Sequence, residues 1–137
     1  MAFKVFADTN IIIDLIEQRD FDLDSIHQIV NLSEAGEIDI YISETVITNA
    51  LYITKLQGHI EKVLEFTTVL CIGNDIIKKA LDSSFKDKED AILYYGGLHA
   101  KMDFFITRDS KHFLNHALVQ LPVLAPKALL AKLKAPK

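Results

Sequence analysis

Residues 3–18 read FKVFADTNIIIDLIEQ and join a short, largely apolar run, FKVFA, to a helix-like segment, NIIIDLIEQ. A single acid, Asp8, stands between the two. A short apolar run favours a strand, and a strand followed at once by a helix is the repeating unit of α/β proteins. The stretch therefore predicts a strand over residues 3–7 and a helix over residues 10–18, with Asp8 at the junction.

The same alternation continues to the end of the chain. Further strands are predicted over residues 39–43, 67–72, 103–107 and 120–125, and helices over residues 26–32, 44–58, 59–66, 75–85, 89–102, 110–116 and 127–134. Five strands separated by helical segments predict a mostly parallel sheet with right-handed crossovers and helices on both faces. In such a fold the ligand crevice lies beyond the carboxyl ends of the strands, where the strand order reverses.

Size and charge narrow the class of protein. With 137 residues, half of them apolar, the chain is long enough for one core, so we expect a single domain over residues 1–137. A net charge of −4 gives no global basic field, so any polyanion must bind at a local patch.

Asp8 and Asp14 interrupt the early apolar run well short of the about 20 residues of a membrane span, which predicts a soluble, cytoplasmic protein. The lone cysteine, Cys71, suits a reducing compartment and is expected to be buried.

Four acids stand where strand-like runs give way to helix-like ones: Asp8, Glu44, Asp90 and Asp109. Each alone could be a helix cap or a first-turn charge. As a converging set they would repel one another by about 4 kcal/mol per pair at about 4 Å and an effective dielectric near 20, which favours a bound divalent cation. Carboxylate oxygens without matched His or Cys ligands favour Mg²⁺ or Mn²⁺ over Zn²⁺. Near the third acid, Asp87 is the preferred helix cap, Asp90 points across the rim, and Glu89 is expected to face elsewhere.

Four short motifs contain these acids: D-T-N at residues 8–10, S-E-T at 43–45, K-E-D-A-I-L at 88–93 and I-T-R-D at 106–109. In this order and spacing they resemble the PIN-domain nucleases, particularly the small single-domain group that includes the VapC-type toxins of toxin–antitoxin pairs. The resemblance covers almost the whole chain. It implies a parallel three-layer α/β/α sandwich and a Mg²⁺- or Mn²⁺-dependent endonuclease that cuts single-stranded RNA.

The resemblance also implies roles for individual residues. It makes Asp8, Glu44, Asp90 and Asp109 the catalytic acids, with Asn10 and Thr107 as polar neighbours. Asp8, Asp90 and Asp109 would be the metal ligands, and Glu44 the outer acid that orients or deprotonates a water. A shifted register in the third motif would give the role of Asp90 to Asp87 or Glu89. A homodimer and an antitoxin protein that covers the acidic cleft are the implied partners.

Contacts to RNA require local positive charge. The acids are flanked by four cations that could meet phosphates, Lys86, Lys88, Arg108 and Lys111, although an ordinary solvated face explains them as well. His112 and His116 are interpreted as surface residues because no third metal ligand lies nearby in sequence.

Two other function classes stay open. A haloacid-dehalogenase-like phosphatase also opens with a strand and an acid, but it would have a second aspartate where Asn10 stands. The other is a non-catalytic module that binds a partner protein, and the intact set of four acids argues against it.

Overall fold

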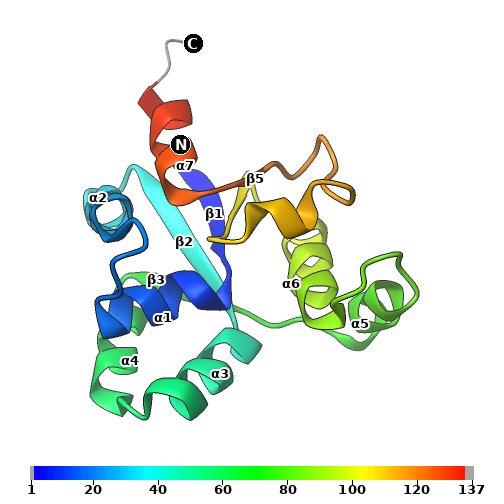
Figure 1. Cartoon of the computed structure of the whole chain (residues 1–137), viewed down its shortest axis with the longest axis horizontal. Helices are drawn as coiled ribbons and strands as arrows, with labels where there is room; N and C mark the ends of the chain where they lie inside the picture. The colour runs from blue at the N-terminus through cyan, green and yellow to red at the C-terminus, as the bar shows by residue number, and fades with distance from the viewer. Residues whose placement is uncertain (1, 135–137) are drawn as a thin grey trace.

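A computed structural model describes residues 2–134 of the chain, and it contains one five-stranded sheet (Figure 1). All neighbouring strands pair in parallel, in the order β3-β2-β1-β4-β5. The strands are β1 (Phe3–Ala7), β2 (Ile38–Ser43), β3 (Thr67–Leu70), β4 (Phe104–Ile106) and β5 (Val123–Leu124). The predicted parallel sheet is confirmed, and its strand order reverses between β1 and β4.

The helices cover both faces of the sheet, as predicted. Helices α1 to α4 lie on one side and α5 and α6 on the other (Figure 1), while α7 packs against α2. The helical segments are α1 (Thr9–Glu17), α2 (Leu23–Glu34), α3 (Glu44–Thr54), α4 (Gln57–Leu64), α5 (Asn74–Leu81), α6 (Lys88–His99), the 3₁₀ helix η1 (Ser110–Phe113) and α7 (Pro126–Lys134). No helix within residues 2–134 is long and apolar enough to cross a membrane.

The two central strands are buried and carry the site. Val5, Phe6 and Phe105 are fully buried, because β1 and β4 have a neighbour on each side and helices on each face. The hydroxyl of Tyr94 on α6 donates to the Leu121 carbonyl oxygen (2.9 Å) and accepts from the Leu118 backbone N–H (2.6 Å). These bonds tie α6 to the segment that follows β4, so the two elements that carry Asp90 and Asp109 are held to one another.

Several predicted boundaries were wrong. Gly58 was expected to end the helix that starts at residue 44, but α3 ends at Thr54 and Gly58 lies inside α4. Lys55 takes the left-handed conformation that a glycine more often supplies, with φ of 55°, and its N–H bonds to the Leu51 carbonyl oxygen. The short helix expected over residues 110–116 is the 3₁₀ helix η1, which ends at Phe113, and the fifth strand has two residues where six were expected. Local sequence pattern does not specify such ends.

Candidate active site

Asp8 and Thr107 meet at the carboxyl ends of the two central strands. Asp8 follows β1 and Thr107 follows β4, and the Asp8 backbone N–H bonds to the Ile106 carbonyl oxygen at 2.9 Å. The Thr107 hydroxyl donates to Oδ2 of Asp8 at 2.7 Å, and the Thr9 backbone N–H donates to Oδ1 at 2.7 Å. Asp8 is therefore both the cap of α1 and part of the strand-end site. Asp8 is 6% exposed and Thr107 is fully buried, so the pair is held rigidly.

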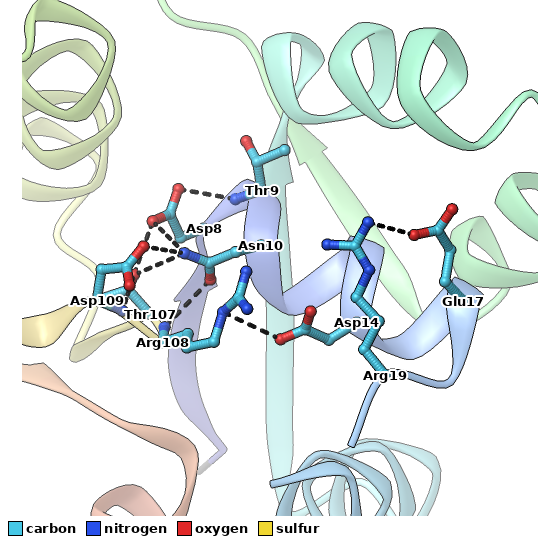
Figure 2. A network of polar contacts seen from close by, with 9 residues as sticks. All are labelled: Asp8, Thr9, Asn10, Asp14, Glu17, Arg19, Thr107, Arg108 and Asp109. Atoms are coloured by element: carbon cyan, nitrogen blue, oxygen red, sulfur yellow. Dashed lines mark hydrogen bonds and ion pairs between the residues drawn. The ribbon is translucent and has the colours of Figure 1, made fainter. Parts of the chain in front are cut away.

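Asn10 joins these two residues to Asp109 (Figure 2). Its side-chain amide donates to Oδ2 of Asp109 at 3.1 Å and to the Thr107 hydroxyl at 3.3 Å. Its Oδ1 accepts from the Arg108 backbone N–H at 3.1 Å, and the Asp109 backbone N–H donates to the Thr107 hydroxyl at 3.1 Å. Four of the residues predicted from sequence thus form a single hydrogen-bonded network, although residues 10 and 107 are far apart in the chain.

Asp90 is coupled to this network by charge. It lies in the first turn of α6, where burial, then the negative charges of Asp8 and Asp87, raise its pKa to about 7, while His112 opposes the shift. The pKa of Asp8 is also raised, first by burial and further by the charge of Asp109, against the hydrogen bond from Thr107. Carboxylates that disfavour one another's ionised form create a site where a cation is favourable.

The neighbours of Asp90 have separate roles. Asp87 accepts from the backbone N–H groups of Glu89 (3.0 Å) and Asp90 (3.2 Å), which confirms it as the cap of α6. Glu89 was expected to face away from the site, and this was wrong. Its Oε1 accepts from the Asn49 side-chain amide on α3 at 2.7 Å, and its charge contributes to the raised pKa of Asp8. Sequence reasoning missed the Asn49–Glu89 pair because it bridges two helices 40 residues apart.

Glu44 lies in the first turn of α3, exposed to solvent. Hydrogen bonding to Glu44 raises the pKa of the Cys71 thiol, which follows β3. Cys71 was expected to be buried, but it is exposed, because β3 ends at Leu70 and the chain leaves the sheet there. Glu44 is thus at the same edge of the sheet as Asp8, but its contact is with Cys71, in the loop that follows β3.

Of the predicted cations, Arg108 and Lys88 have partners within the protein. Nε of Arg108 lies 3.4 Å from Oδ2 of Asp14, and its guanidinium carbon lies 4.2 Å from the centre of the Phe21 ring. Asp14 is almost completely buried and its oxygens accept no hydrogen bond, so burial raises its pKa while Arg108 lowers it. Lys88 donates to the Ser83 carbonyl oxygen at 2.8 Å.

The other two predicted cations, Lys86 and Lys111, are exposed. Arg108, which lies beside Asp109 in the chain, is only 29% exposed at its side chain. Of the four predicted cations, Arg108 and Lys88 are thus held by contacts within the protein, and Lys86 and Lys111 extend into solvent.

The oxygen donors fit a hard divalent cation. Among residues 2–134, no three acidic, histidine or cysteine side chains already form a closed metal cage. Mg²⁺ does not need one, because it keeps several of its waters and binds through one or two carboxylates. The negative charge of Asp8 disfavours the ionised form of Asp90, the charge of Asp109 disfavours that of Asp8, and Asp109 is bonded into the same network. The donor set therefore suits Mg²⁺ or Mn²⁺ better than Zn²⁺.

Known proteins resemble this chain in sequence and in fold. The profile of the family described as PIN domain matches residues 4–111, a span that includes every predicted acid. Ribonuclease VapC1 of Aquifex aeolicus is 28% identical over 102 residues, which are 66% of this chain and 71% of the relative.

Two solved structures share the fold. A toxin–antitoxin complex from Klebsiella pneumoniae superposes with a TM-score of 0.66 at 23% identity and covers 89% of this chain and 97% of that one. VapBC2 from Rickettsia felis, bound to a DNA fragment from its promoter, gives a TM-score of 0.68 at 14% identity, with 90% and 98% covered. At these identities the two structures speak for the fold alone.

Proposed function

This chain belongs to the PIN domain family, and from that premise we propose that it is a metal-dependent endoribonuclease that hydrolyses phosphodiester bonds of single-stranded RNA. One observation carries the proposal. A single hydrogen-bonded network at the carboxyl ends of β1 and β4 joins Asp8, Asn10, Thr107 and Asp109. The negative charge of Asp8 also raises the pKa of Asp90. The similarity to a ribonuclease supports RNA as the substrate.

We assign the metal to Asp8 and Asp90 as direct ligands and to Asp109 as a third ligand, directly or through water. When bound, Mg²⁺ or Mn²⁺ would lower the pKa of a water and stabilise charge on the phosphate and the leaving oxygen. The protein's part is orientation: Thr107 donates to Oδ2 of Asp8 and Asn10 donates to Oδ2 of Asp109, so neither carboxylate rotates freely.

The attacking water also needs an acid that orients it or takes its proton. Glu44 is the first assignment because of its place in the S-E-T motif. Glu89 is the second, because its charge helps to raise the pKa of Asp8 and because the Asn49 side-chain amide fixes its carboxylate. The variants Glu44→Gln and Glu89→Gln distinguish the two assignments. Only the substitution of the acid that acts on the water should lower the cleavage rate.

The remaining roles concern binding partners. Lys86, Lys88, Arg108 and Lys111 are proposed to contact phosphates on either side of the scissile bond, with Lys88 first releasing the Ser83 carbonyl. Because the structural neighbours are toxin–antitoxin complexes, we propose that the chain is the toxin of such a pair, with an antitoxin protein that covers the acidic cleft. A homodimer is proposed as its assembly state, to be checked by light scattering.

The test is cleavage of end-labelled single-stranded RNA in Mg²⁺, Mn²⁺ or EDTA. We expect cutting in either metal, none in EDTA, and none by Asp8→Asn or Asp90→Asn. Asp24→Asn is the matched control, because Asp24 is an exposed first-turn acid on α2. Equal cutting by wild type and both site variants would point to a contaminant and refute the proposal. Hydrolysis of p-nitrophenyl phosphate without RNA cleavage would favour the phosphatase class instead.

A further inference from the structure

A cavity of about 560 Å³ opens directly beside Asp90. The cavity is lined by the segment 84–87 and by Asp90, His112, Asn115 and His116. Its volume lies in the range of about 300–1,000 Å³ that is usual for small-molecule sites. The metal-binding role proposed for Asp90 gives this cavity no occupant, since Asp8, Asn10, Thr107 and Asp109 are not among its lining residues.

One wall of the cavity is a prepared aromatic surface. The imidazole of His116 stacks on the Phe85 ring, with centres 4.1 Å apart and planes 22° apart, and Phe85 itself is buried. The Ser84 hydroxyl lies 3.1 Å from Nδ1 of His116. The imidazole is therefore fixed on one face and at one edge, while the partly exposed remainder lines the cavity. Aromatic side chains held in this way are platforms on which unpaired nucleic-acid bases stack.

The other lining groups can recognise the edge of a base and a phosphate. Asn115 is exposed and offers both amide donors and a carbonyl acceptor, a pattern that can pair with the edge of a nucleobase. Lys86 is exposed at the same cavity and can neutralise a phosphate. His112 adds a third side chain close to Asp90. Charge, hydrogen-bonding groups and a stacking surface are thus present within reach of one nucleotide.

We propose that this cavity is a nucleotide subsite in which a base of the RNA strand stacks on His116 beside the scissile phosphate. The inference rests on the proposed ribonuclease function and adds to it the residues that hold the substrate. A strand that lays its phosphate at Asp8 and Asp90 reaches the cavity with the adjoining nucleotide, because Asp90 belongs to both the acidic cluster and the cavity wall. The i,i+4 pair His112 and His116 then has a substrate-binding role in place of a metal-binding one.

A fluorescence experiment tests base binding without cleavage. The chain has no tryptophan, so His116→Trp places a single reporter on the platform. In EDTA, a short single-stranded RNA should quench this tryptophan, whereas ribose 5-phosphate, which has no base, should not. His27→Trp on α2, exposed and on the other face of the sheet, is the control and should not respond to either. Quenching equal at both positions, or at neither, overturns the subsite.

Steady-state cleavage provides the second arm. His116→Ala should raise KM for RNA by about 5- to 150-fold, since stacking on one aromatic side chain is worth about 1–3 kcal/mol. His116→Phe keeps an aromatic face and should restore KM to near the wild-type value, which a merely structural role for the imidazole does not predict. Unchanged KM in His116→Ala, with the protein folded by circular dichroism, overturns the proposal.

The two arms also separate this inference from the function on which it rests. If wild-type protein fails to cut RNA but RNA still quenches the tryptophan of the His116→Trp variant, the ribonuclease proposal falls and the base-binding subsite stands. If wild type cuts RNA in a metal-dependent way and neither quenching nor a KM change appears, the subsite falls and the nuclease stands.

Discussion

Asp90→Asn should make the protein more stable at alkaline pH while it abolishes cleavage. Burial and the charges of Asp8 and Asp87 raise the pKa of Asp90 from 3.8 to about 7. The folded protein therefore holds a proton on Asp90 over a pH range in which the unfolded chain has lost it. The free energy of unfolding therefore falls as pH rises from about 4 to about 7, and above pH 7 the folded protein carries the full penalty of an ionised Asp90. The asparagine side chain carries no charge, and the substitution leaves in place the backbone N–H of this position, which bonds to Asp87.

The size of the effect follows from the shift. About three pKa units correspond to about 4 kcal/mol at about 1.4 kcal/mol per unit. Asp90 is only partly buried, and solvent screening reduces the destabilisation expected from its charge to about 1–2 kcal/mol. At pH 8 this is a rise in Tm of about 4–8 °C for a chain of this size. At pH 5 the difference should be less than half as large.

Thermal unfolding followed by circular dichroism at pH 5 and pH 8, with and without Mg²⁺, is the assay. Mg²⁺ should raise the Tm of wild type at pH 8, because a cation that binds only the folded state stabilises it. It should raise the Tm of Asp90→Asn much less. Asp24→Asn should match wild type in every condition. A Tm of Asp90→Asn at or below that of wild type at pH 8 would refute the repulsion on which the proposed metal site depends.

Three further variants test other parts of the structure. Thr107→Val removes the buried hydroxyl that links the strand-end acids. We expect the free energy of unfolding, measured in urea, to fall by about 1–3 kcal/mol and the cleavage rate to fall by about 10- to 100-fold. An unchanged cleavage rate would show that Thr107 is not part of the site. Arg108→Met removes the cation beside the buried Asp14 carboxylate and should lower the free energy of unfolding by about 1–3 kcal/mol at pH 8. The loss of stability should be smaller at pH 5, because the carboxylate takes up a proton there. A loss of stability that does not depend on pH would contradict this prediction. Gly97→Ala places a methyl group 2.9 Å from the buried Phe6 ring and should destabilise the folded protein by about 1–3 kcal/mol. The alanine of Gly58→Ala meets no atom within 4 Å, so this variant should stabilise the folded protein by about 0.4–1 kcal/mol. Equal effects of the two variants in thermal unfolding would argue against tight packing under α6.

The strand-end residues were the part of the site most accessible to sequence reasoning. Asp8 and Thr107 each follow an apolar run, and parallel strands bring such positions to one edge of the sheet whatever the details of packing. The capping role of Asp87 was also predictable, because a cap bonds to backbone N–H groups only a few residues away.

The helix-borne residues were less accessible. Glu89 was assigned to the wrong side, since its direction depends on how α6 is rotated against α3, where Asn49 meets it. His116 was interpreted as an ordinary surface residue because nothing near it in the chain shows that Phe85 lies against its ring.

Alternating apolar runs in the sequence by themselves determined the parallel sheet, the helices on its two faces and the rim at which Asp8 and Asp109 stand, because strand and helix periods and short connections are local properties. Only the tertiary structure decided which side chains meet across elements: Asn49 with Glu89, Asp14 with Arg108, and Phe85 with His116. Such pairs depend on how helices and loops are rotated and packed against one another, and many distant contacts set that rotation together.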